Sequence, residues 1–222
     1  MLQDNKHYKE LVKEFDSFMF RKDKSQVFEA LIDYCVAGFC LDAHVTKWSF
    51  SKEDTATIAK MFGLWILAAK DEIYRDGWAD IPGNLHQSCI YSGGAKGFLG
   101  QYFSPENVCS LMAQCTLANV EALQKKVITL NDPACGSGRT LLASHVFLQE
   151  KHLRDYCVAQ DIDRVCVKMC VANFLIHGLE GEVICGNTLI AGDRRFRFVV
   201  NEGINNPLSK YFGIPHCRYE EF

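Results

Sequence analysis

The sequence predicts an α/β protein in which an N-terminal helical domain precedes a partial, doubly wound parallel sheet. From residue 127 onward, short apolar runs alternate with longer helical patterns, which is typical of β-α-β units. Before residue 76, apolar residues recur only at three- and four-residue steps, which indicates helices. The glycine- and proline-containing stretch that follows predicts a connector. We therefore expect a helical domain with its connector over residues 1–97 and an α/β domain over 98–222.

The strands are expected at residues 127–130, 155–160, 182–185 and 196–200. Helices are expected after Pro105 as far as residue 117, at 140–150 and at 164–177, and the N-terminal helices should include one that begins at Ser51. In the helix after Pro105, the residues expected to form the buried face are Val108, Leu111, Met112 and Cys115.

Composition limits the class of protein. The formal net charge is −3, so the chain lacks the strong basic excess of many stand-alone DNA-binding domains. Neither a signal peptide nor a long apolar run is present, which predicts a soluble, cytoplasmic protein without a membrane partner. The eleven cysteines are scattered without a Cys-x-x-Cys pair, so we expect reduced thiols and no metal site.

The stretch from Val127 to Arg139 carries the strongest functional signal. A β-branched run ends at Asp132, turns through Gly136 and Gly138, and continues into a helical pattern. The glycines allow a ligand to approach the backbone, and the start of the helix presents N–H groups to it. Asp132 can accept from an ammonium or a hydroxyl but repels phosphate, so the loop suits a ligand with both carboxylate and ammonium groups.

The segment Asp132-Pro133-Ala134-Cys135-Gly136-Ser137-Gly138 resembles the first S-adenosylmethionine (SAM) motif of amino-group DNA methyltransferases, and Gly100-Gln101-Tyr102-Phe103-Ser104-Pro105-Glu106 resembles their upstream motif. The most similar members are adenine-N6 modification subunits of type I restriction systems. The resemblance implies a Rossmann-like SAM-dependent methyltransferase fold, SAM as cofactor, and DNA as partner, with a specificity subunit or a second copy as further partners. Implied cofactor-binding residues are Gln101, Tyr102, Phe103, Ser104, Pro105, Asp132, Ala134, Gly136, Ser137, Gly138 and Arg139.

Three further positions have alternative interpretations. Asp161 ends the second strand, where an acid can bind both ribose hydroxyls, whereas Asp163 is interpreted as a helix N-cap. Asn187 replaces the family's adenine-binding aspartate and is interpreted either as an adenine contact or as a turn residue. Arg139 either meets the carboxylate of SAM or extends into solvent.

The catalytic motif of the family is not evident. Its Asn/Asp-Pro-Pro-Tyr/Phe tetrapeptide holds and stacks a flipped adenine after the fourth strand, where this chain has Phe196-Arg197-Phe198-Val199-Val200-Asn201-Glu202-Gly203. Asn206 and Pro207 lie nearby and are the remaining candidates. The family's sheet also has about three more strands, so this chain should hold its cofactor half. We expect an exposed strand edge that the C-terminal tail, a second copy or a partner subunit covers.

These features leave two hypotheses. One is an adenine-N6 DNA methyltransferase of a restriction-modification system, and the alternative is a noncatalytic SAM-binding regulatory or partner subunit. A dinucleotide-binding oxidoreductase is disfavoured because the loop lacks the third glycine of that fingerprint.

Overall fold

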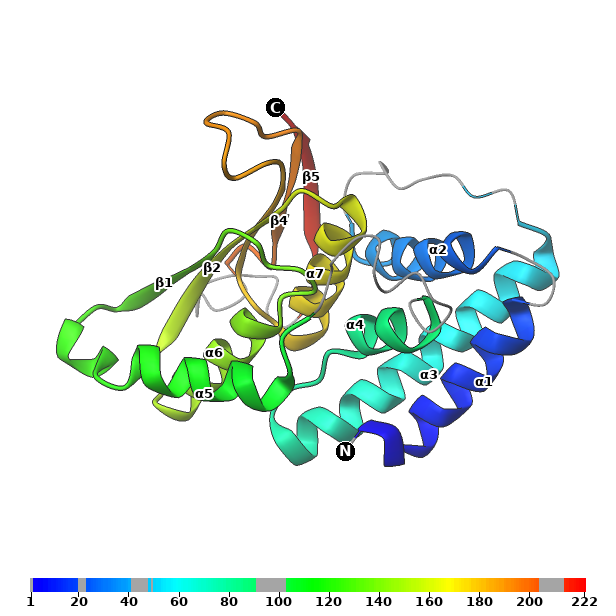
Figure 1. The fold of residues 1–222 in the computed structure, drawn as a ribbon, viewed down its shortest axis with the longest axis horizontal. Coiled ribbons are helices and arrows are strands. Elements are labelled where there is room, and N and C mark those ends of the chain that lie inside the picture. The colour runs from blue at the N-terminus through cyan, green and yellow to red at the C-terminus, as the bar shows by residue number, and fades with distance from the viewer. Residues whose placement is uncertain (1, 20–22, 41–47, 49, 91–102, 204–213) are drawn as a thin grey trace. The chain divides into compact units, whose positions relative to one another are not determined.

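The computed structural model describes residues 2–19, 23–40, 48, 50–90, 103–203 and 214–222. The chain divides into two compact units, one formed by Met1–Gly38 and Ala43–Tyr102 and the other by Phe39–Asp42 and Phe103–Phe222 (Figure 1). The predicted boundary between residues 97 and 98 lies outside the described residues. No helix in the described part of the chain is both long and apolar enough to cross a membrane.

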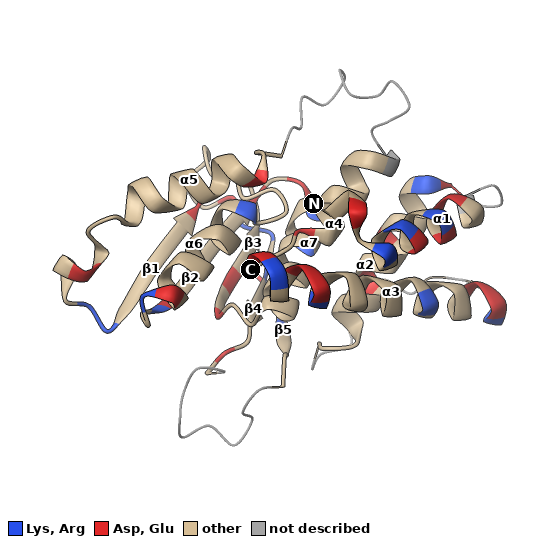
Figure 2. Cartoon of the chain, turned by 90° about the horizontal axis from the view of Figure 1, so that it is seen from below, with Lys and Arg blue, Asp and Glu red and all other residues tan. Residues whose placement is uncertain are grey.

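The first unit is helical, as the sequence predicts. Phe15, Leu31 and Trp65 are at most 1% exposed and belong to its apolar core. Ser51 caps the third helix by accepting from the backbone N–H of Asp54 at 3.1 Å, which confirms the predicted start. Acidic and basic residues are interspersed along α1 (Figure 2). The helical elements are η1 (Leu2–Asp4), α1 (Lys6–Met19), α2 (Lys24–Ala37), α3 (Lys52–Asp76), α4 (Ile81–Leu85) and the π-helical turn η2 (His86–Ile90).

The second unit contains a five-stranded sheet in the order β1-β2-β3-β4-β5. The first three strands are parallel, and β4 is antiparallel to both β3 and β5. The sheet and the elements before and between its strands are α5 (Glu106–Leu117), η5 (Val120–Leu123), β1 (Val127–Asp132), α6 (Arg139–Glu150), β2 (Arg154–Asp161), α7 (Arg164–His177), β3 (Gly181–Cys185), β4 (Phe196–Val200) and β5 (Cys217–Glu221).

The connection from β3 to β4 explains why β4 is antiparallel. A parallel crossover needs a dozen or more residues, whereas residues 186–195 form a shorter link that returns from the same end of the sheet. The two ends of this link approach so closely that a Cβ on Gly186 would lie 1.9 Å from the carbonyl oxygen of Asp193. The sequence pattern located β4 correctly, and the predicted parallel sheet holds for β1–β3 but not for β4.

Helices α6 and α7 cover one face of the sheet. The strand order advances from β1 to β3 without reversing, so right-handed crossovers place both helices on the same side. Side chains on that face, such as Cys157, Ala159 and Val183, are completely buried. On the opposite face of β1, Thr129 and Asn131 are exposed.

The predicted buried face of α5 is wrong. Val108, Leu111 and Met112 are 41%, 59% and 49% exposed, and Cys115 is exposed as well. The residues that turn inward are Cys109, Ala113 and Leu117, and their mostly small side chains suit close packing of α5 on α6. Both stripes of this helix are apolar, so periodicity alone could not determine which one is buried.

Strand β5 was not predicted from the sequence. It pairs with β4, and Cys40 forms an isolated bridge with its first residue. The backbone N–H of Cys217 donates to the carbonyl oxygen of Phe39 at 2.9 Å. A segment far away in the sequence therefore contacts β5, which a local pattern cannot reveal.

Candidate cofactor-binding site

The loop after β1 has the conformation that its glycines predict. Gly136 and Gly138 have φ angles of 54° and 89°, in the left-handed region that residues with a Cβ rarely adopt. A Cβ on Gly138 would lie 2.8 Å from the sulfur of Cys170, so the space beneath the loop is filled as well. Gly138 is the N-cap of α6 and offers no capping side chain, and the first-turn N–H groups of α6 point out from the start of the helix.

Asp132, at the end of β1, helps to shape this loop. One carboxylate oxygen accepts from the backbone N–H of Ala134 at 3.1 Å, and the hydroxyl of Thr140 donates to the other. These bonds join both ends of the loop to the last residue of the strand. The carboxylate is half-buried and retains lone pairs for a ligand.

Asp161 connects the loop to the end of β2. Its Oδ2 accepts from the N–H of Gly136 at 2.9 Å, and its Oδ1 accepts from the N–H of Asp163 at 2.9 Å. The backbone N–H of Cys135 donates to the carbonyl oxygen of Gln160 at 2.9 Å, so the loop and the strand end are joined twice. Asp163 caps α7 through the N–H of Val165 at 2.8 Å, as its N-cap interpretation predicts.

The described part of the upstream motif lies against the loop. A Cβ on Gly136 would lie 3.0 Å from two ring carbons of Phe103. The guanidinium of Arg139 stacks 5.4 Å from the centroid of the same ring and donates to the carbonyl oxygen of Ser104 at 3.1 Å. Arg139 is only 5% exposed, which excludes its predicted extension into solvent. Its observed role is to hold residues 103 and 104 beside the loop.

Asn173 was not singled out from the sequence. This residue of α7 is completely buried, and its amide nitrogen donates to the carbonyl oxygen of Ser137 at 2.8 Å. Cys170 lies one turn earlier, under Gly138, and burial raises the pKa of its thiol. The only available sequence signal was an asparagine within a helix that is otherwise largely apolar.

Asn187 adopts the turn that one of its two interpretations predicts. Its side-chain oxygen accepts from the N–H of Leu189 at 3.0 Å, and its own N–H donates to Asp193 at 3.0 Å. The neighbouring Thr188 donates its hydroxyl to the carbonyl oxygen of Pro133 at 2.6 Å. This turn therefore contacts the loop after β1, and a contact of Asn187 with adenine stays a prediction.

Four predicted positions, Gln101, Tyr102, Asn206 and Pro207, lie outside the described residues. Pro105 is the N-cap of α5. Asn201 follows β4, and because β4 is antiparallel, its end pairs with the start of β3 at Gly181. Asn201 therefore lies at the opposite end of the sheet from Asp132 and Asp161. Of the stretch that corresponds in sequence to the catalytic tetrapeptide, Phe196 pairs with Cys185 at the end of β3 near Asp161, whereas the asparagine lies at the far end.

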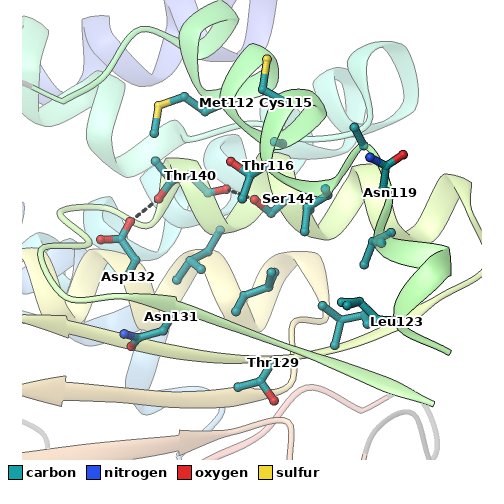
Figure 3. Close-up of a pocket in the computed structure, with 17 residues that line it drawn as sticks. Met112, Cys115, Thr116, Asn119, Leu123, Thr129, Asn131, Asp132, Thr140 and Ser144 are labelled. Atoms are coloured by element: carbon teal, nitrogen blue, oxygen red, sulfur yellow. Dashed lines mark hydrogen bonds between the residues drawn. The ribbon is translucent and has the colours of Figure 1, made fainter. Parts of the chain in front are cut away.

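A pocket of about 680 Å³ begins at Asp132 and extends along β1 beneath α5. Figure 3 shows the carboxylate of Asp132 directed toward Thr140, with Ser144 further along α6 and Asn119 and Leu123 at the far end. The wall is polar near Asp132, and it is largely apolar where Leu117, Val120 and Ile128 come together. The pocket is within the size range of small-molecule sites.

The sequence of this chain matches the model of a known protein family. The model of the N-6 DNA Methylase family matches residues 90–208, more than half of the chain. The chain belongs to the N-6 DNA methylase family. The comparison with curated proteins gave no match.

Two solved structures are similar to this N-6 DNA methylase. One is described as a putative class I S-adenosylmethionine-dependent methyltransferase from Listeria monocytogenes, with 14% identity and a TM-score of 0.52 over 84% of this chain and 55% of that chain. The other is a type I restriction-modification methyltransferase subunit from Streptococcus thermophilus, with 20% identity and a TM-score of 0.37 over 59% of this chain and 27% of that chain. The Listeria structure supports the α/β methyltransferase fold, and this chain spans about half of its length.

Proposed function

We propose that this chain binds SAM at the loop after β1 and transfers its methyl group to the N6 atom of adenine in DNA. The observation that supports this proposal best is the convergence of Asp132, Asp161 and the glycine loop at one end of the sheet. Ligands of open α/β sheets bind at this end of the parallel strands. Family membership supports the substrate class.

The residues present fit SAM. Asp161 would accept from the ribose hydroxyls, and Asp132 would accept from the ammonium of the methionine part. The left-handed Gly136 and Gly138 keep the loop free of side chains, and the N–H groups at the start of α6 suit the carboxylate. Phe103 lies over Gly136 and would form an apolar wall beside the ligand. In the same proposal Gln101, Tyr102 and Asn187 complete the site.

When bound, SAM supplies an electrophilic methyl group on a sulfonium. The protein must orient the adenine amino group toward it and accept hydrogen bonds from that group, since the base has to leave the DNA stack. Among the described residues, no asparagine lies at this end of the sheet in the position of the family tetrapeptide. Asn206 and Pro207 remain the proposed source of these acceptors.

A noncatalytic SAM-binding subunit is the second candidate. The observation that favours it is the antiparallel β4, which places Asn201 away from the candidate site. In this alternative the chain binds SAM as a regulatory or partner subunit, and a partner, such as a specificity subunit, contributes the recognition of DNA. Asp132, Asp161 and the glycine loop have the same role in both candidates.

Two measurements separate these candidates. We expect isothermal titration calorimetry to show one SAM site per chain. Incubation with radiolabelled SAM and adenine-containing duplex or single-stranded DNA should then yield N6-methyladenine, detected by mass spectrometry of the digested DNA. SAM binding without transfer to any DNA would favour the noncatalytic candidate, and absence of SAM binding would exclude both.

Replacing Asn173 by alanine should weaken SAM binding about tenfold. The change removes the hydrogen bond from Asn173 to the carbonyl oxygen of Ser137, and losing such a bond in a buried site costs roughly 1–3 kcal/mol. Because the loop is then held less firmly, part of this cost should appear as weaker SAM binding. Calorimetry gives the SAM affinity, and urea unfolding gives the stability.

Val171→Ala is the matched control for Asn173→Ala. It also shortens a completely buried side chain of α7, but it removes no bond to Ser137. We expect lower stability and a change of less than about threefold in SAM affinity. Equal losses of affinity in the two variants would show that Asn173 acts only through general packing.

A further inference from the structure

Arg139 is a buried cation at a place where a helix does not favour one. It is the first residue of α6, whose first turn contains no acidic residue, and it is only 5% exposed. The N-terminus of a helix carries partial positive charge, and burial removes the hydration of a guanidinium. Other contacts of the side chain must offset both effects, and those contacts indicate what the residue does.

The guanidinium of Arg139 contacts the segment before α5 in two ways. It stacks 5.4 Å from the centroid of the Phe103 ring, and its Nη1 donates to the carbonyl oxygen of Ser104 at 3.1 Å. The thiol of Cys109, a buried residue of α5, donates to the same carbonyl oxygen at 3.8 Å. Donors from α5 and α6 therefore converge on one carbonyl group just before α5 begins. We call the contacts of Arg139 with Phe103 and Ser104 the Arg139 clamp.

Phe103 extends the clamp to the loop after β1. Two of its ring carbons lie 3.0 Å from the position of a Cβ on Gly136, so the ring lies directly against the backbone of this loop. In the proposed function this ring is the apolar wall of the SAM site. A shift of Phe103 would change the shape of the site, while Asp132 and Asp161 would keep their places.

We propose that Arg139 is a positioning residue, which holds Phe103 over the glycine loop and affects SAM binding through this ring, not through the carboxylate of SAM. This role rests on the proposed function of the site. A protein whose binding-competent state is only partly populated binds its ligand more weakly in proportion to that population. Opening of the clamp and loss of SAM affinity are therefore two measurements of one equilibrium.

The chemistry of arginine suits this role. A guanidinium is planar, so it can stack on an aromatic ring and donate within its plane to a carbonyl oxygen, whereas an ammonium is a compact, strongly hydrated charge. Arg139→Lys therefore keeps the charge but loses most of the stacking. Arg139→Met keeps the apolar stem, which also contributes to packing, and removes the guanidinium.

The first test uses hydrogen exchange without a ligand. The N–H of Cys109 donates to the carbonyl oxygen of Pro105 at 3.0 Å, so its exchange rate reports on the first turn of α5. We expect this amide to exchange at least about fivefold faster in Arg139→Met than in the wild type. Arg164→Met is the matched control, because Arg164 is the first residue of α7 and stacks 5.1 Å from the ring centroid of Phe196. It is exposed, and its loss should leave the Cys109 amide unchanged.

The second test compares SAM with decarboxylated SAM by calorimetry. Arg139→Met should weaken the binding of both ligands by the same factor, about tenfold, because both would contact the wall that Phe103 forms. Direct recognition of the carboxylate would weaken only SAM. Arg139→Lys should recover less than about threefold of the loss. Saturating SAM should restore slow exchange of the Cys109 amide in Arg139→Met, because a ligand and the state it prefers stabilise each other.

Phe103→Leu tests whether the effect passes through the ring. In this background the stacking partner of Arg139 is already absent, so Arg139→Met should lower SAM affinity less than about threefold. Equal effects of Arg139→Met in the wild-type and Phe103→Leu backgrounds would show that the ring is not involved and would overturn the proposal.

Two further outcomes overturn the positioning role while the proposed function stands. One is unchanged exchange of the Cys109 amide in Arg139→Met, and the other is a loss of affinity for SAM but not for decarboxylated SAM. A wild-type chain that binds neither ligand overturns the proposed function and, with it, the effect of the clamp on SAM. Thermal unfolding shows whether each variant is folded, and Arg139→Lys allows the same comparisons should Arg139→Met fail to fold.

Discussion

Replacing Asn201 by alanine should lower the free energy of unfolding of the second unit, which contains the sheet, by about 3–5 kcal/mol. This is the range expected when several buried hydrogen bonds lose one partner. The side chain is completely buried. Its amide nitrogen donates to the carbonyl oxygens of Phe174 and Leu179 at 3.0 and 2.9 Å, and its oxygen accepts from the N–H of His216 at 3.1 Å. One side chain thus joins the C-terminal end of α7, the segment before β3 and the segment before β5.

The backbone at Asn201 adds a second contribution. Its φ angle is 53°, in the left-handed region that asparagine tolerates better than alanine. Asn201→Gly removes the same side-chain bonds without this strain, so it should be less destabilised than Asn201→Ala. Urea unfolding followed by circular dichroism measures both variants. Asn107→Ala replaces an exposed asparagine of α5 and should change stability by less than about 0.5 kcal/mol.

The same variants test whether Asn201 has a catalytic role. Its position at the far end of the sheet predicts that it acts on folding alone. A stable Asn201→Ala protein that binds SAM normally but has lost methyl transfer would contradict both the direction of β4 and this assignment.

Local patterns in the sequence were enough to predict most elements of the sheet unit. The predicted helix at 164–177 and strand at 196–200 agree with the observed α7 and β4 at both ends. The glycine loop was also predictable, because left-handed backbone at Gly136 and Gly138 restricts the residue type. These features depend on interactions between residues close together in the chain.

Features that depend on distant segments could not be predicted in this way. The direction of β4 depends on the pairing of Phe196 with Cys185, and a strand has the same alternation in either direction. The structural roles of Asn173 and Asn201 depend on carbonyl oxygens 22 to 36 residues away in the chain. For α5, two apolar stripes were equally plausible until its packing on α6 was known.

Replacing Asp161 by alanine should weaken SAM binding about 100-fold or more, because each charge-assisted hydrogen bond to a buried partner contributes roughly 1.5–3 kcal/mol. In the proposed site this carboxylate accepts from the ribose while it holds the N–H of Gly136. Its loss therefore removes contacts to the ligand and a contact that shapes the loop. Calorimetry with SAM gives the change in affinity, and thermal unfolding shows whether the variant is folded.

Two comparisons distinguish the ribose contact from a purely structural effect of Asp161. Asp163→Asn alters a neighbouring carboxylate that caps α7, and because asparagine is also a good N-cap, SAM affinity should change less than about threefold. A SAM analogue with 2′-deoxyribose should bind the wild type more weakly than SAM does, whereas Asp161→Ala should no longer distinguish the two ligands. This comparison works as a double-mutant cycle in which the ligand carries the second change, and it isolates the interaction of Asp161 with the ribose 2′-hydroxyl. Equal discrimination by the wild type and by Asp161→Ala would place the ribose elsewhere and leave Asp161 only its bonds to the Gly136 and Asp163 backbone.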